Sequence, residues 1–253
     1  MEENTENVVP GLGFIKDISD ERDLLWRSVV APQAISMPKK FKLGSLGGVL
    51  NQGDKPFCIG YSTASMKLFS EFASHKKYYS FDPVWLYKEC KKIDGIPDQD
   101  GTYLRVALKI IQDTGYLAKA QRYKLKEDTY FKIEKYVRLT SLRQIKECIY
   151  HVGPVVFGIT VDEGIYTPDR NGVIPEPNPS SVIGGHAQLI TGWNDNKECQ
   201  GSRGAFIVKN SWGKEYGNRG YYWLPYSYFT AYPDFDAWKT VDAKDLIEGY
   251  GEF

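Results

Sequence analysis

The feature that most constrains the fold is a change of pattern near residue 150. Between residues 57 and 114, apolar side chains recur at steps of three and four, which predicts helices over 57–74, 83–92 and 104–114. Beyond residue 153, short runs rich in branched and aromatic residues predict strands over 154–161, 186–193, 204–210 and 220–226. Helices that are segregated from strands along a chain are typical of an α+β architecture, with a cleft where the two parts meet.

The same pattern divides the chain into three parts. Residues 1–45 are rich in proline, glycine and charge and have no sustained period, so we expect an N-terminal extended arm. Residues 46–150 form the predicted helical lobe, and residues 151–253 the β-rich lobe. The arm either crosses the cleft as a short removable propeptide or packs on the surface, and we favour surface packing.

Composition limits the partners and the compartment. The 32 Lys and Arg residues balance 32 Asp and Glu residues, so no basic excess points to nucleic acid or an anionic membrane. No apolar run reaches the roughly 20 residues of a membrane span, and the first residues do not resemble a secretory signal. The 4 cysteines are too few and too scattered for a disulfide scaffold. We expect a cytoplasmic protein, or one associated with a phage or virion; the oligomeric state is not predicted.

Cys58 lies at the start of the first predicted helix. A thiol at a helix N-terminus is close to unpaired backbone N–H groups, whose partial positive charge favours the nucleophilic thiolate. The ordinary alternative is a small buried hydrophobic residue, which is the commoner role of an intracellular cysteine. Other residues are therefore needed to favour catalysis.

Three further polar residues would complete a nucleophilic site. Gln52, in a glycine-containing loop, would donate to an oxyanion together with the Cys58 N–H. His186 follows two glycines at the start of a predicted strand and would serve as general base. Asn210 follows another strand, beside Trp212, and would orient the imidazole. Each one alone has an ordinary explanation, as a loop amide, a histidine at a strand end or a turn residue.

The order Gln52, Cys58, His186, Asn210, with separations of 6, 128 and 24 residues, resembles that of the papain-like cysteine peptidases, the papain and cathepsin family. Residues 184–187 (GGHA) and 209–213 (KNSWG) are similar to the family's histidine and asparagine motifs. Residues 100–102 (DGT) resemble its substrate-binding glycine loop. The resemblance covers about residues 37–228.

This resemblance implies a papain-like two-lobe fold, with an N-terminal helical lobe, a C-terminal β-barrel-like lobe and the active-site cleft between them. It implies a cysteine endopeptidase, or thiol protease, that hydrolyses extended polypeptides through a thioester, with a thiolate–imidazolium pair formed before substrate binds. No metal and no cofactor is implied. The implied catalytic residues are Cys58, His186, Asn210 and Gln52, and the implied substrate-binding residues are Gly101, Thr102, Gly185 and Trp212.

Departures from the family pattern leave alternatives open. Residues 55–59 (KPFCI) match the usual nucleophile motif only at Cys58, and Thr102 replaces a glycine common in the family. Loss of the motif's first cysteine resembles intracellular bacterial, archaeal and phage-type branches. An inactive peptide-binding module and an acyl-transferring peptide ligase on the same fold remain alternatives. The other three cysteines, Cys90, Cys148 and Cys199, are interpreted as structural thiols.

Overall fold

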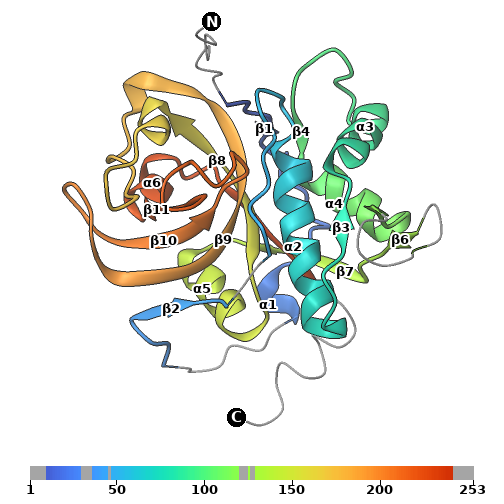
Figure 1. Ribbon diagram of the computed structural model, residues 1–253, viewed down its shortest axis with the longest axis horizontal. Helices are drawn as coiled ribbons and strands as arrows, with labels where there is room; N and C mark the ends of the chain where they lie inside the picture. The colour runs from blue at the N-terminus through green and yellow to red at the C-terminus, as the bar shows by residue number, and fades with distance from the viewer. Residues whose placement is uncertain (1–9, 30–35, 45–46, 120–124, 126–128, 242–253) are drawn as a thin grey trace, which may run out of the picture.

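Two lobes lie on either side of one long helix in the computed structural model, which describes residues 10–29, 36–44, 47–119, 125 and 129–241. The helix is α2 (Cys58–His75), and Figure 1 shows it between a large sheet on one side and helices α3 (Pro83–Ile93) and α4 (Leu104–Asp113) on the other. The three predicted helices are confirmed, with ends that differ by one residue. The architecture is α+β, as predicted.

Local sequence sets the ends of these helices. The Asp82 carboxylate caps α3 by accepting hydrogen bonds from the N–H groups of Val84 (3.0 Å) and Trp85 (3.1 Å). Pro83, the first residue of the helix, has no N–H group and so needs no such partner. Helix α4 ends just before Gly115, whose φ of 103° is readily adopted only by glycine. The apolar faces of α2, α3 and α4 then pack together as one core.

The second lobe is built on a seven-stranded antiparallel sheet of order β11-β10-β9-β8-β12-β7, with β2 also paired to β9. The four predicted strands are present as β8, β9, β10 and β11, while β2, β7 and β12 were not predicted. Among the described strands, the two edges β11 and β7 do not pair, so the sheet is open and the expected barrel does not close. The strands are β2 (Lys40–Lys42), β7 (Lys135–Leu139), β8 (Val155–Asp162), β9 (Val182–Glu198), β10 (Arg203–Lys209), β11 (Tyr221–Pro225) and β12 (Asp236–Val241).

The predicted boundaries at residues 45 and 150 do not coincide with these lobes. Strands β2 and β7 precede residue 150 yet belong to the large sheet, and helix α5 (Leu142–His151) packs against β8 and β9. The arm also supplies β1 (Phe14–Ile15), which pairs in parallel with β4 (Thr102–Tyr103). The remaining elements are α1 (Trp26–Val29), β3 (Ser80–Phe81), β5 (Tyr116–Lys119), β6 (Tyr130–Phe131), α6 (Ser227–Ala231) and two short 3₁₀ helices, Glu163–Tyr166 and Pro179–Ser181.

None of the helices in the described part of the chain has both the length and the apolar character needed to cross a membrane.

Candidate active site

Cys58 is the first residue of α2, and its side chain is completely buried. The N–H groups of Ile59 and Cys58 itself, at the start of the helix, are placed to donate to its sulfur. So is the N–H of Ala187, which lies in β9 directly after His186. The fold therefore brings the start of α2 and the histidine strand into contact across the two lobes.

His186 and Asn210 form a direct side-chain pair. His186 Nε2 lies 2.8 Å from Asn210 Oδ1, and that oxygen also accepts the Ser211 N–H at 2.8 Å. Because an amide oxygen can only accept, Nε2 carries the proton and Nδ1 is the basic nitrogen of the ring. Nδ1 is buried and has no hydrogen-bond partner among the described residues. Trp212 stacks on the imidazole, with ring centroids 4.6 Å apart and an interplanar angle of 21°.

Gln52 is held on both sides of its amide. Its backbone N–H donates to Ser211 O (2.9 Å), and its Oε1 accepts from Ser211 Oγ (2.6 Å). These bonds direct Nε2 toward two backbone carbonyls, Gly11 O at 2.9 Å and Lys55 O at 2.8 Å. Ser211 was not identified from the sequence, although it lies within the asparagine motif.

The arm runs between the two lobes, along the predicted site. Gly11 N–H donates to Gly53 O (3.0 Å), and Gly13 N–H donates to Gly185 O (3.1 Å) on the sheet side. On the helical side, Thr102 N–H donates to Gly13 O at 3.0 Å. The expectation that the arm packs on an outer surface is therefore wrong for this segment, because its backbone pairs with both walls.

Glycines in the walls allow this close approach. A Cβ atom at position 158 would lie 2.1 Å from the Phe14 ring, and one at position 185 would lie 2.3 Å from Phe14 O. Gly101 has a φ of 88°, and a Cβ there would lie 2.6 Å from Gly13 O. Of the predicted substrate-binding residues, Gly101, Thr102 and Gly185 thus contact the arm, whereas Trp212 covers the His186 ring.

Burial shifts the pKa of the thiol and of the imidazole toward their neutral forms. It raises the pKa of Cys58 to about 12, despite the N–H groups of Ala187 and Ile59 that favour the thiolate. Burial also lowers the pKa of His186 to about 4, despite the opposing hydrogen bond to Asn210. In the covered site, burial thus acts against the expected thiolate–imidazolium pair, because it disfavours the charged form of both groups.

The remaining cysteines are not among the predicted catalytic residues, although Cys90 lies beside Thr102. Cys90 and Cys148 are buried, Cys199 is partly exposed, and none of the three forms a disulfide within the described residues. In the described part of the chain, no group of three or more His, Cys, Asp or Glu side chains is placed to hold a metal ion.

The sequence is similar to those of known cysteine proteases. The pattern of the papain family cysteine proteases matches residues 72–229, which is more than half of the chain and includes His186 and Asn210 but begins after Cys58. An uncharacterized peptidase C1-like protein of Acanthamoeba polyphaga mimivirus is 25% identical over 269 residues, covering 89% of this chain and 84% of that protein. Cathepsin L2 of Homo sapiens is 22% identical over 208 residues, covering 75% of this chain and 61% of its own length.

Solved structures show the same relationship. Xylellain, a cysteine protease from Xylella fastidiosa, superposes with a TM-score of 0.75 at 26% identity, covering 92% of this chain and 97% of its own. Procathepsin B S9 from Trypanosoma congolense, at 14% identity and a TM-score of 0.65, shares the fold over 82% of this chain and 78% of its own. The chain therefore belongs to the papain family of cysteine proteases.

Proposed function

We propose that this chain is a cysteine endopeptidase that hydrolyses extended polypeptides. Its N-terminal arm keeps the enzyme inactive by occupying the site. The observation that carries the proposal is the His186–Asn210 pair, which leaves a basic, unpartnered Nδ1 on the strand that contacts the Cys58 sulfur. A nucleophile, a base and a residue that orients the base are the minimum set for covalent acyl transfer.

The reaction proceeds in two steps. The Cys58 sulfur attacks the peptide carbonyl carbon while its proton passes to His186 Nδ1, and that proton then goes to the departing amine as the C–N bond breaks. A thioester to Cys58 remains. In the second step, His186 takes a proton from a water molecule, the hydroxide attacks the thioester, and the released thiolate is reprotonated by the imidazolium.

Gln52 and the Cys58 N–H stabilise the oxyanion of both steps. Gln52 Nε2 already donates to a peptide carbonyl, that of Gly11, so its position suits recognition of a carbonyl oxygen. The Ser211 hydroxyl holds the other end of the same amide, which limits the reorganisation needed during reaction. Donors that are fixed before the charge develops contribute most to such stabilisation.

Latency follows from the path of the arm. The arm's backbone takes the hydrogen bonds of Gln52, Thr102 and Gly185, and Cys58 has no exposed surface. A substrate backbone needs the same partners, so the arm must leave before catalysis, either by displacement or as a removed propeptide. The partner we propose is accordingly a polypeptide in extended conformation.

The test is cleavage of a diverse peptide library by the purified full chain and by Cys58→Ala. Cys199→Ala is the matched control, because Cys199 is a free, partly exposed thiol away from the site. We expect cleavage by the wild type and by Cys199→Ala, and none by Cys58→Ala.

Two results would contradict the proposal. Peptide binding without cleavage by any variant, even after the arm is displaced by a competing peptide, would identify an inactive binding module. New amide products in place of free acids, when an amine is added, would identify a ligase.

A further inference from the structure

The loop that carries one wall of the cleft has little regular structure of its own. Residues 94–101 connect α3 to β4, which is only two residues long. Even so, the Thr102 N–H at the end of this loop makes a 3.0 Å hydrogen bond to the arm backbone at Gly13 O. Something outside the loop must fix the direction of that N–H group.

Lys91, in the last turn of α3, binds the loop at three points. Its Nζ donates to Ile96 O (2.6 Å), Gln99 O (2.8 Å) and Gly101 O (3.1 Å). An ammonium group has three protons to donate, and four acceptors surround this one: the three carbonyls of the loop and the Asp94 carboxylate. The side chain is only 16% exposed, so little water competes for these bonds.

Asp94 links the ammonium group to the cleft. Its carboxylate is completely buried and lies 2.9 Å from Lys91 Nζ. The same oxygen accepts from Thr102 Oγ1 at 3.0 Å, and the other oxygen accepts the Ile96 N–H at 3.1 Å. Although burial opposes ionisation, the bonds from Lys91, Ile96 and Thr102 hold the pKa of Asp94 below its ordinary value. These bonds therefore favour the charged carboxylate, which accepts the hydrogen bond from Thr102 Oγ1.

A second side chain of helix α3, that of Tyr87, also acts on the loop. Tyr87 lies one helical turn before Lys91, and its hydroxyl accepts the Gly101 N–H at 3.1 Å. Gly101 is thereby held at both its N–H and its carbonyl, one residue before the N–H that faces the cleft.

We propose that Lys91 is a positioning residue of the peptidase: its ammonium group holds residues 96–101 so that the Thr102 N–H is presented to an extended peptide backbone. This inference rests on the proposed peptidase function, because the substrate it names is a peptide. The arm binds the same Thr102 N–H, and this binding does not depend on catalysis. Lys91 touches neither substrate nor the reacting atoms; it acts through Gly101 and Thr102.

The test separates binding of the arm from binding of substrate. Alkylation of Cys58, followed by mass spectrometry of the full chain, measures how often the arm leaves, because Cys58 is completely buried when the arm is docked. Turnover of an extended peptide measures the substrate reaction. Phe14→Ala weakens only the arm, so we expect alkylation and turnover to rise together in this variant.

Lys91→Met removes the charge but keeps a side chain of similar length. Because arm and substrate use the same edge, we expect alkylation to rise about tenfold, roughly the effect of one net backbone hydrogen bond, with no matching rise in turnover. Turnover divided by alkylation rate should therefore fall about tenfold relative to Phe14→Ala. Lys92→Met is the matched control, since Lys92 is exposed and pairs only with Glu89 in the described structure; both rates should stay at the wild-type values.

Lys91→Arg guards against a variant that simply fails to fold. Arginine retains the charge and several donors, so we expect it to restore most of the protection of Cys58. Two results would overturn the inference: alkylation of folded Lys91→Met at the wild-type rate, or turnover that rises in step with alkylation as in Phe14→Ala. If no variant hydrolyses peptides, the peptidase proposal fails, while the alkylation rates still show whether Lys91 positions the edge.

Discussion

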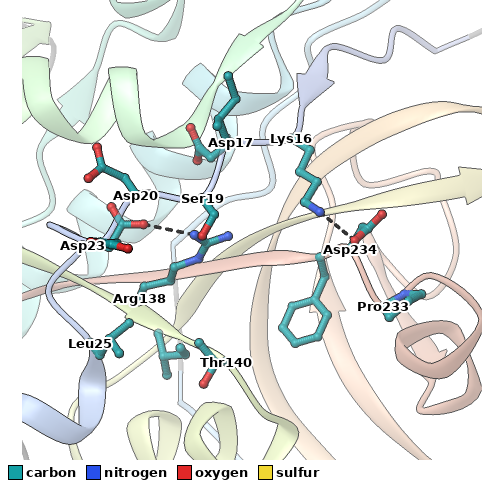
Figure 2. Close-up of a pocket in the computed structure, with 14 residues that line it drawn as sticks. Lys16, Asp17, Ser19, Asp20, Asp23, Leu25, Arg138, Thr140, Pro233 and Asp234 are labelled. Atoms are coloured by element: carbon teal, nitrogen blue, oxygen red, sulfur yellow. Dashed lines mark hydrogen bonds and ion pairs between the residues drawn. The ribbon is translucent and has the colours of Figure 1, made fainter.

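Release of the arm should depend on pH through Asp17, which lies two residues after the end of β1. Three carboxylates, those of Asp17, Asp23 and Asp236, share two guanidinium groups there. Arg105 binds Asp23 with two hydrogen bonds (2.8 and 2.7 Å), and Arg138 binds both Asp23, at 3.0 Å, and Asp236. Figure 2 shows the pocket that Asp17, Asp23 and Arg138 line together.

Asp17 is the carboxylate with the weakest compensation in this cluster. It accepts the backbone N–H of Arg105 at 3.1 Å, but the nearest approach of the Arg105 guanidinium is 3.8 Å, too long for a strong hydrogen bond. Burial, followed by the charge of Asp236, raises the pKa of Asp17 from 3.8 to about 7, against the attraction of Arg105 and Arg138. Burial likewise raises the pKa of Asp236. The docked arm therefore holds a proton that a released, hydrated Asp17 gives up.

The sign and size of the effect follow from this difference. A group whose pKa is raised in the docked state stabilises docking fully below its ordinary pKa and loses that contribution as the pH rises to the docked value. Docking should therefore weaken by up to about tenfold per pH unit between about pH 4 and about pH 7, and level off above that. The shift from 3.8 to about 7 corresponds to about 4 kcal/mol in total.

The assay is the rate of Cys58 alkylation in the wild type divided by that in Asp17→Asn, from about pH 5 to about pH 8. The ratio cancels the intrinsic pH dependence of the thiol, and asparagine imitates the protonated acid without titrating. We expect the ratio to rise steeply and then flatten near pH 7. Asp20→Asn, which alters a partly exposed carboxylate bound to Arg22 in the same segment, should follow the wild type.

A ratio that stays constant over this pH range would refute the reasoning. Asp236→Asn gives a second check, because removing the neighbouring charge should move the steep region to lower pH. If both variants unfold, amide hydrogen exchange of residues 11–19 in the wild type still reports arm release at each pH.

Other predictions concern the site and the helical lobe. Gln52→Ala should lower kcat about 10²- to 10³-fold, measured per titrated active site, because one oxyanion donor is lost; an unchanged kcat would remove Gln52 from the mechanism. Asp82→Ala should lower the free energy of unfolding in urea by about 1 kcal/mol, since the cap of α3 is lost, and unchanged stability would contradict that role. Leu108→Ala, at a fully buried position, should cost about 2 to 5 kcal/mol in the same measurement, and a loss far below this would show that the core can collapse around the cavity.

Some features of the site were predictable because they depend on order along the chain. The helix start at Cys58, the histidine strand and the turn at Asn210 follow from local patterns, and the structure places His186 and Asn210 in contact across 24 residues. Ser211 lies beside Asn210 and was missed, because a serine in a turn gives no sign of a distant partner. Its bond to Gln52 spans 159 residues.

The sequence by itself determined the helices α2, α3 and α4 and the strands β8 to β11, because apolar periodicity records which face of a local element is buried. The sequence pattern did not predict strands β2, β7 and β12, because a short strand is specified by partners far away in the chain. Only the tertiary structure decided where the arm runs and which charges the site can hold. The arm's hydrogen bonds need two walls that come from different lobes. The pKa shifts of Cys58 and His186 result from burial, which exists only once the chain has folded around these side chains.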